Sequence, residues 1–320
     1  MEAILTGVEI VLTIFFIIAI GAFCTWRKWF DENTQKVLSF LVTKVGLPCM
    51  VVSNIIEKYT RDDILGSLLV ILVPIVTIFV NYWLGQGVAR LIRLPKNRRG
   101  VFTAMFAFSN TIFIGLPVNV ALFGEATVPY TMLYYVSQTF IFWTLGISGI
   151  RKDGEPDDKT KIFTWAGMKK LFTMPLIAFF VGMLFVLLEI PMPKFLGDGF
   201  GYIGKIVTPL SLLFTGIVLY NMGFKSLCFD WSILVMSVGR FLISPLLVFA
   251  MMQLMPISAD LMSVTLKTFL VQASMPIMTQ TVIFAKSYGA DAEYATQGLM
   301  FTTILSVVFI PLYAWIGGIV

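Results

Sequence analysis

Apolar stretches of about 20 residues recur from one end of the chain to the other, separated by short polar loops. A helix of that length crosses the hydrocarbon core of a bilayer and satisfies its own backbone polar groups there. The pattern predicts an all-α polytopic membrane protein with ten transmembrane helices. The expected spans are residues 3–26, 34–56, 64–92, 100–123, 127–150, 167–190, 198–222, 230–253, 261–285 and 292–319.

One hydrophilic segment, Arg151–Lys161, leaves five spans on each side. The expected units are a first five-helix repeat at 1–150, a cytoplasmic linker at 151–166 and a second five-helix repeat at 167–320. Because five is odd, two related halves must insert with opposite topology. Internal spacing supports such an inverted repeat, because K-x-x-x-P motifs begin at Lys44 and Lys205, 161 residues apart. Similarly, Pro117 and Pro276 are 159 residues apart.

Composition agrees with a membrane protein, since 58 % of the residues are hydrophobic, 13 % are charged and the mean hydropathy is +0.89. The net charge of +5 comes from basic residues in short loops, which indicates membrane orientation rather than nucleic-acid binding. With the N- and C-termini outside, Lys58, Arg61 and Lys194 lie outside. The cytoplasmic side then holds Arg27, Lys28, Lys36, Arg90, Arg93, Lys96, Arg98, Arg99, Arg151, Lys152, Lys159, Lys161, Lys169, Lys170, Lys225 and Lys286.

Two of the apolar spans are interrupted by polar and helix-breaking residues. The fourth span carries Asn110, and Gly115 and Pro117 two positions apart predict that one helix ends there and another begins. The ninth span has a polar segment around Pro276. Broken helices 4 and 9 that cross at mid-membrane are a pointer to the substrate site of a transporter. The alternative is a pair of ordinary proline kinks whose loose carbonyls are satisfied by Ser and Thr.

If the helices cross, each half-helix after a break directs its N-terminus, with unpaired N–H groups and about half a positive charge, at the membrane centre. Such ends suit a carboxylate. The predicted substrate-binding residues are Ser109, Asn110, Thr111, Gly115, Pro117, Val118, Gln272, Ser274, Pro276, Ile277, Thr279 and Gln280.

The charged residues expected within the apolar zone are all cations, namely Lys44, Lys205, Arg240 and Lys267. We interpret them as counter-charges or gating residues, with snorkelling towards the interface as the alternative. An all-cation interior favours an anionic substrate over a metal cation and leaves no obvious protein carboxylate to carry a proton. The chain has no histidine, and its three cysteines lack metal-type spacing, so neither a metal nor a cofactor is expected.

The motifs S-N-T-I-F-I-G-L-P-V (Ser109–Val118), A-S-M-P (Ala273–Pro276), V-I-F-A-K-S-Y-G-A-D (Val282–Asp291) and I-P-L-Y (Ile310–Tyr313) resemble those of the auxin efflux carrier family. This family includes plant auxin exporters and bacterial organic-acid permeases. The resemblance implies a scaffold of helices 1, 2, 6 and 7, often a homodimer interface, and a transport domain of helices 3–5 and 8–10 that moves as an elevator. The short linker points to a prokaryotic-type carrier of the bacterial inner membrane, for which auxin is not the expected physiological substrate.

We therefore expect a secondary active or facilitative transporter of small organic anions, such as malate or malonate, embedded in the lipid bilayer. A membrane enzyme is not expected, because no nucleophile, metal site or acid–base pair is found at depth. A channel or a non-transporting sensor on the same fold remains the alternative.

Overall fold

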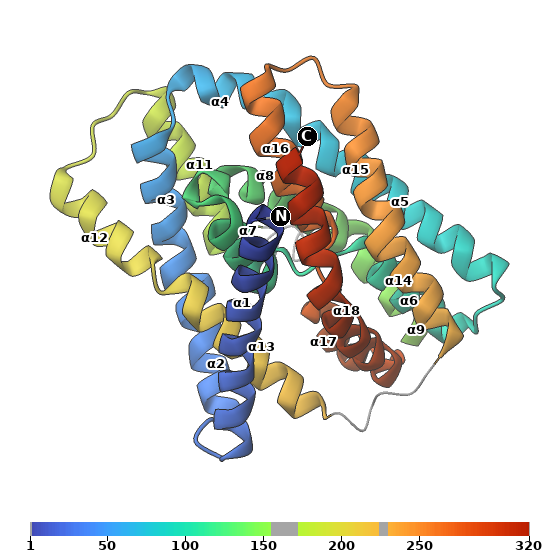
Figure 1. Cartoon of the computed structure of the whole chain (residues 1–320). Helices are drawn as coiled ribbons and strands as arrows, with labels where there is room; N and C mark the ends of the chain where they lie inside the picture. The colour runs from blue at the N-terminus through green and yellow to red at the C-terminus, as the bar shows by residue number, and fades with distance from the viewer. Residues whose placement is uncertain (1, 155–171, 224–229, 320) are drawn as a thin grey trace.

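The computed structural model describes residues 2–154, 172–223 and 230–319, and these ranges are folded almost entirely into helices (Figure 1). Most of the expected linker and the start of the sixth span lie outside the described residues. The first half contains α1 (Glu2–Trp26), α2 (Glu32–Phe40), η1 (Leu41–Gly46), α3 (Leu47–Lys58), α4 (Arg61–Ser67), η2 (Leu68–Ile71), α5 (Leu72–Leu91), η3 (Lys96–Arg98), α6 (Arg99–Ala107), η4 (Thr111–Gly115), α7 (Leu116–Phe123), η5 (Glu125–Thr127), α8 (Val128–Ile141), η6 (Phe142–Gly146) and α9 (Ile147–Gly154).

The second half is helical as well, within residues 172–223 and 230–319. It contains α11 (Met174–Leu187), α12 (Lys194–Gly204), α13 (Val207–Met222), α14 (Trp231–Val238), η8 (Gly239–Ile243), α15 (Ser244–Gln253), α16 (Ala259–Ala273), α17 (Thr279–Ser287) and α18 (Ala292–Ile319). Six helical stretches within the described ranges are long and apolar enough to cross a membrane, and two shorter apolar helices are Thr111–Phe123 and Met174–Leu187.

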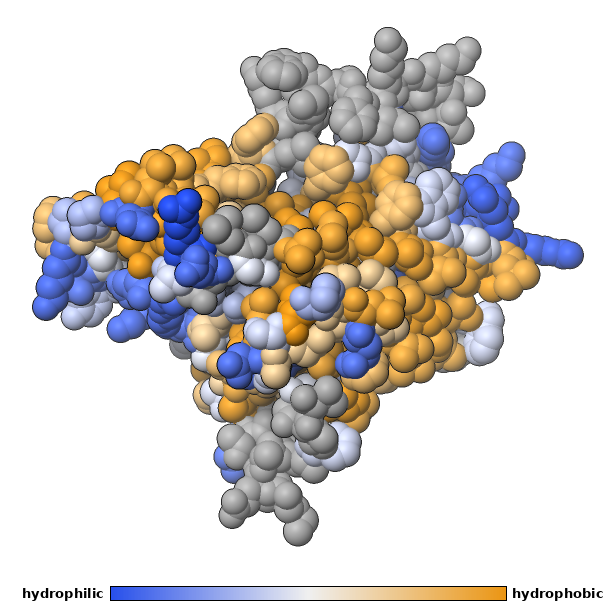
Figure 2. Space-filling model, turned by 90° about the horizontal axis from the view of Figure 1, so that it is seen from above, coloured by the Kyte–Doolittle hydropathy of each residue, from blue (hydrophilic) through white to orange (hydrophobic). Residues whose placement is uncertain are grey.

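Large hydrophobic side chains cover the outside of the molecule. Phe16, Phe79, Phe180 and Leu246, from four different helices, are each about half exposed or more. Figure 2 shows hydrophobic side chains over the broad centre of one face and hydrophilic ones gathered towards two opposite edges. Soluble monomers rarely expose so many large apolar side chains next to one another, whereas the hydrocarbon of a lipid bilayer accommodates them. The chain is therefore a polytopic membrane protein.

Three prolines widen their helices without ending them. Pro48, Pro117 and Pro245 each stand at the second position of an α-helix that follows a π-helical turn, namely η1, η4 and η8. A proline has no N–H and its ring displaces the carbonyl four residues earlier, so a wider turn accommodates it. For Pro245 that carbonyl belongs to Phe241, and it accepts a hydrogen bond from the Tyr313 hydroxyl at 2.6 Å.

This geometry corrects one expectation. The fourth span does not break at Gly115 and Pro117, which both lie in continuous helical backbone. It breaks at Phe108–Asn110, several residues earlier, where the chain is extended between α6 and η4. In the ninth span the interruption includes Pro276, between α16 and α17.

The helices pack in two groups. In one, α1 lies along α13, and α3 contacts both α11 and α12. In the other, α5 packs on α6 and α8, and α16 packs on α15 and α18. Of the two interrupted spans, α6, α16 and α17 belong to the second group. The remaining part of the fourth span, η4 and α7, lies between the groups, because it also contacts α13 and α1. The interruptions lie in the interior, where Phe106, Phe108 and Phe269 are buried around them.

Candidate functional site

The two helix breaks pair with each other. The backbone N–H of Asn110 donates to Pro276 O at 2.8 Å, and that of Met278 donates to Phe108 O at 3.1 Å. Ser109 and Ile277 form an antiparallel bridge between these bonds. Unpaired backbone groups at this depth would each cost several kcal/mol in hydrocarbon, so each extended segment stabilises the other. The consequence is that the first turns of η4 and α17 start side by side.

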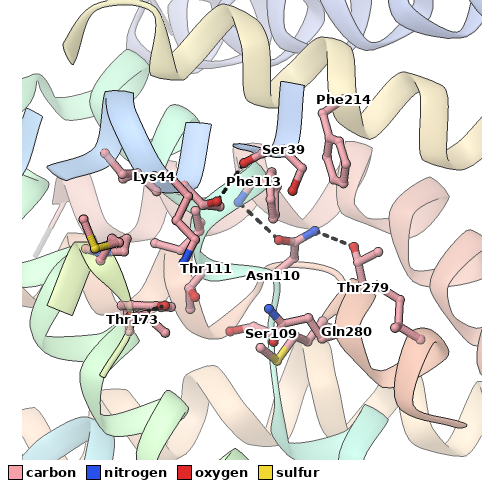
Figure 3. A pocket seen from close by; sticks show the side chains of 18 residues that line it. Ser39, Lys44, Ser109, Asn110, Thr111, Phe113, Thr173, Phe214, Thr279 and Gln280 are labelled. Carbon is pink, nitrogen blue, oxygen red and sulfur yellow. Dashed lines mark hydrogen bonds between the residues drawn. The ribbon is translucent and has the colours of Figure 1, made fainter. Parts of the chain in front are cut away.

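Asn110 connects these two helix starts. Its side-chain Oδ1 accepts from Phe113 N at 3.3 Å, which makes it the N-cap of the helix that begins at Thr111. Its Nδ2 donates to Thr279 Oγ1 at 3.1 Å, in the first turn of α17 (Figure 3). The residue is only 4 % exposed. An asparagine at this position therefore supplies a cap and a bridge with no net charge.

A cavity of about 260 Å³ lies against this junction. Six of the sequence-predicted residues line it, and Figure 3 shows Lys44 on the opposite side from Thr279. Its predicted lining residues are Lys44, Ser109, Asn110, Thr111, Thr279 and Gln280. The lining residues that sequence reasoning missed are Ser39, Thr43, Leu47, Ile112, Phe113, Tyr135, Thr173, Met174, Pro175, Phe214, Met278 and Ile283.

Four of the missed residues, Ile112, Phe113, Met278 and Ile283, are apolar neighbours of the predicted ones in the two interrupted spans, and the others come from other helices or, for Thr173, from the residue just before α11. Ser39 and Thr43 lie on α2 and η1, while Tyr135 lies on α8 and contacts the Thr173 hydroxyl at 3.1 Å. Phe113 and Phe214 stack with ring centroids 4.3 Å apart, and this stack joins the two helix groups. Hydroxyl groups in otherwise apolar spans are a weak signal, because they also satisfy carbonyls of their own helix.

Gln138 on α8 holds the extended segment from behind. Its Oε1 accepts from the Ser109 amide at 2.9 Å and from the Ser109 hydroxyl at 3.0 Å, and its Nε2 donates to Ser109 O at 2.7 Å. Gln138 is fully buried. Sequence reasoning did not select it, although an amide side chain in an apolar span was a usable signal.

Other predicted residues surround the junction without lining the cavity. Gln272 Nε2 lies 3.4 Å from Thr131 Oγ1 and 3.5 Å from Thr111 O, and its Oε1 has no partner among the described residues. Gly115 lies against this amide, and any Cβ at Gly115 would collide with it. The remaining predicted residues outside the cavity lining are Pro117, Val118, Ser274, Pro276 and Ile277.

The four predicted cations are in four different environments. Lys44 lines the cavity. Arg240 is fully buried beside the ends of α6 and α16. Lys205 lies 5.4 Å from the Tyr202 ring and Lys267 lies 5.3 Å from the Phe123 ring, both away from the cavity.

The charge of the cavity lining is positive. Lys44 is the one charged side chain among its lining residues within the described ranges, and no carboxylate lines it. The helix starts at Thr111 and Thr279 add partial positive charge. In the described part of the chain, no three His, Cys, Asp or Glu residues are grouped so that they could hold a metal ion. The arrangement suits an anion with carboxylate oxygens.

A second hollow of about 660 Å³ lies between the ends of α3 and α11 and the start of α12. It is more open, its lining carries acidic Glu57, Glu189 and Asp198 as well as basic Arg61 and Lys194, and it does not reach the junction. Because acidic and basic side chains both line this open groove, it does not select between positively and negatively charged ligands.

Known proteins place the chain among transporters. It matches the family described as "Membrane transport protein" over residues 6–314. An uncharacterized transporter of Methanocaldococcus jannaschii is 25% identical over 314 residues, covering 96% of this chain and 98% of that protein. An uncharacterized transporter of Methanothermobacter thermautotrophicus is 25% identical over 310 residues, covering 96% of this chain and 97% of the relative. The chain is a member of this membrane transport family, the auxin efflux carriers.

Proposed function

We propose that the protein is a secondary carrier that moves small organic anions across the membrane by alternating access. The observation that carries this proposal is the junction of two helix N-termini, bridged by Asn110, at the wall of a cavity that also holds Lys44. Backbone N–H groups at helix starts bind carboxylates through hydrogen bonds and the helix dipole. A cradle built mostly from neutral groups can release the anion again.

The cavity also favours a class of substrate. A volume of about 260 Å³ fits a mono- or dicarboxylate of a few carbon atoms, such as malate or malonate. Hydroxyls of Ser39, Thr43, Thr111 and Thr279 could bind a second polar group. The stacked Phe113 and Phe214 rings form an apolar wall, which is also compatible with auxin-like carboxylates.

The proposed architecture has ten membrane spans in two inverted five-span repeats, with the N- and C-termini outside. The helices of spans 1, 2, 6 and 7 form the scaffold, with a homodimer interface, and those of spans 3–5 and 8–10 form an elevator-like transport domain. The packing of α5 on α6 and α8, and of α16 on α15 and α18, supports this division, with η4 and α7 facing α13 of the proposed scaffold. The antiparallel pairing of Ser109 with Ile277 supports the opposite directions of spans four and nine.

Under this orientation the structure is an inward-facing state. The cavity lining includes Ser39, Thr43, Lys44 and Leu47 of the second span and Thr173, Met174 and Pro175 of the sixth. Under the proposed orientation, these residues belong to the cytoplasmic halves of their spans. On the other side of the membrane, Lys58 contacts Glu125 at 2.7 Å and the Tyr59 hydroxyl donates to Ala126 O at 2.7 Å. These contacts join scaffold and transport domain on the outer side. A plasma-membrane location in a prokaryotic cell follows from the proposed role.

The test is carboxylate uptake by purified protein in liposomes, for which we compare Asn110→Ala with Asn110→Asp. Asn110→Ala removes the cap and the bridge that hold the two helix starts together at the cavity wall. If the carboxylate thereby loses one hydrogen bond, which contributes about 1.5–3 kcal/mol to a charged group, the affinity should fall at least tenfold. Asn110→Asp keeps an N-cap acceptor and can accept a hydrogen bond from the Thr279 hydroxyl, but it adds a negative charge beside the substrate, so it should abolish uptake.

The readouts are a thermal-shift screen against a panel of carboxylates and counterflow of labelled substrate. Counterflow with saturation is expected of a carrier. Uptake without counterflow would indicate a channel, and carboxylate binding without any uptake would indicate a sensor. Wild-type uptake rates in Asn110→Asp would remove the junction from the binding site.

A further inference from the structure

Arg240 is buried in the protein interior without an acidic partner. Its side chain is fully buried, and none of the ion pairs among the described residues includes it. A buried unpaired charge costs several kcal/mol unless its hydrogen-bond donors are satisfied by other groups. The groups that satisfy Arg240 are therefore informative.

The acceptors of Arg240 are mostly the carbonyls at the ends of the two interrupted helices. Nε and Nη2 donate to Ala273 O at 3.2 and 2.7 Å, where α16 ends. Nη1 donates to Phe106 O at 3.4 Å, in the last turn of α6. Nη2 also donates to Ser244 Oγ at 3.0 Å, and Ser244 in turn accepts from Asn81 Nδ2 at 3.0 Å. One guanidinium thus binds both half-helices that precede the breaks.

The charges at the junction can be counted from these contacts. Each helix C-terminus carries about half a negative charge and each N-terminus about half a positive charge. The C-termini of α6 and α16 together give about one negative charge, which one guanidinium neutralises. The two N-termini at Thr111 and Thr279 then remain as about one uncompensated positive charge beside the cavity. Without Arg240 the four helix ends would cancel.

The same set of acceptors is one that a small cation could occupy. In transporters with discontinuous helices, unwound carbonyls and the C-terminal ends of half-helices coordinate Na⁺ or H⁺. Here Ala273 O, Phe106 O and Ser244 Oγ form such an oxygen set, and the guanidinium of Arg240 occupies it.

We propose that Arg240 is a built-in cation that takes the place of a coupling ion at the helix crossing. Because it is covalently attached, it gives the junction the positive charge that an organic anion needs in every conformation of the transport domain. The carrier then binds and moves its substrate without sodium. The expected effects on uptake rest on the proposed function. The expected effects on thermal stability rest on the contacts of Arg240 alone.

The experiment compares the wild type with Arg240→Ser, Arg240→Lys and the control Arg90→Ser. Arg90 is an exposed arginine of α5 whose guanidinium donates to Gln86. Thermal stability is measured in detergent without substrate, in choline, sodium and low-millimolar guanidinium chloride. Carboxylate uptake is measured in liposomes in the same media.

We expect wild-type stability and uptake to be the same in choline and sodium. Arg240→Ser should be less stable in choline and should regain stability with guanidinium or sodium, by a larger shift in Tm than the wild type or Arg90→Ser shows. Its uptake should become dependent on one of these cations. Arg240→Lys should transport in choline, because the charge remains.

Three outcomes would overturn the inference: wild-type uptake that requires sodium, Arg240→Ser uptake in choline at the wild-type rate, or Arg240→Lys that requires an added cation. If Arg240→Ser does not fold, the wild-type and Arg240→Lys measurements still decide. If no carboxylate of the panel stabilises the wild-type protein or is taken up by liposomes that contain it, the proposed function is rejected instead. The effect of guanidinium on the stability of Arg240→Ser could still be observed in that case.

Discussion

At the scale of single residues, Gln138 satisfies both backbone groups of Ser109 where no helix can do so. We predict that Gln138→Leu, similar in size, destabilises the protein, because each buried group left without a partner costs about 1–3 kcal/mol. Gln138→Glu keeps the acceptor for the Ser109 amide and loses the donor to Ser109 O. The melting temperatures should therefore fall in Gln138→Leu and Gln138→Glu alike.

The control for this prediction is Gln86→Leu, which changes a partly exposed glutamine of α5 that accepts a hydrogen bond from Arg90. It should leave Tm almost unchanged. If Gln138→Leu melts at the wild-type temperature, the extended segment does not depend on this amide.

A polar group that interrupts an apolar span is visible in the sequence, although its role in substrate binding stays a prediction. Asn110 and Thr279 stand out in that way, and the structure places both at the cavity wall. Gln138 was missed because reasoning followed the two interrupted spans, while this residue supports them from a continuous helix. Tyr135 was missed for the same reason, since its position in the cavity depends on how helices pack.

At the scale of elements, a glycine–leucine–proline sequence does not fix where a helix stops. Gly46-Leu47-Pro48 and Gly115-Leu116-Pro117 both follow a wide turn and continue as α-helix. The actual end of α6 is stabilised by tertiary bonds from Pro276 and Gln138, which have no local sequence signature. The sequence therefore predicts that the fourth span is interrupted. The position of the interruption depends on bonds to the segment around Pro276, which the sequence of the fourth span does not reveal.

A titrating group of α9, Asp153, lies beyond the expected fifth span and binds the start of α6. Asp153 Oδ2 accepts from the Val101 amide at 2.8 Å. Burial raises the pKa of Asp153 from 3.8 to about 6, although backbone bonds from Gly100 and Val101 and the nearby Arg99 oppose the shift. Because the folded protein binds this proton more tightly than the unfolded chain, ionised Asp153 destabilises the fold.

We predict that Asp153→Asn, which mimics the protonated acid, raises Tm at neutral pH. The difference from the wild type should be largest well above about pH 6 and should largely disappear as the pH falls to about 4, where the folded wild type is protonated and the unfolded chain is about half protonated. Thermal melts across this range measure it. An unchanged difference at about pH 4 would show that Asp153 acts through packing rather than charge.

At the scale of the whole molecule, hydrophobic periodicity predicted a helical membrane protein because each span must satisfy its own backbone. The relative positions of the helices were beyond this argument. Phe113 and Phe214 meet across the cavity although 101 residues separate them, and nothing in either span signals the contact. The scaffold and transport division therefore remains a proposal that motion must test.

The contact between Lys58 and Glu125, which joins α3 to the segment after α7, offers this test. Lys58 and Glu125 form an exposed ion pair, and such pairs stabilise by only about 0–1 kcal/mol, so it can open during each transport cycle. The background for this test is a chain in which Cys24, Cys49 and Cys228 are replaced by Ser. In it, we predict that Lys58→Cys/Glu125→Cys loses uptake when a short reagent with two thiol-reactive ends joins the two cysteines through reducible disulfide bonds. Reduction should restore uptake, and substrate should still raise Tm in the cross-linked protein because the cavity stays open on its own side.

The matched control is a cross-link inside one helix group. Arg98 contacts Asp291 at 2.7 Å, the same distance as the Lys58–Glu125 pair, but both residues belong to the proposed transport domain. Arg98→Cys/Asp291→Cys should lose some stability, because Arg98 also contacts Asp230. Its uptake should be the same before cross-linking, after cross-linking and after reduction. If both cross-links stop uptake, the second group does not move as a rigid unit. If neither does, the two groups do not separate at Lys58 and Glu125, and an elevator motion past the scaffold is contradicted.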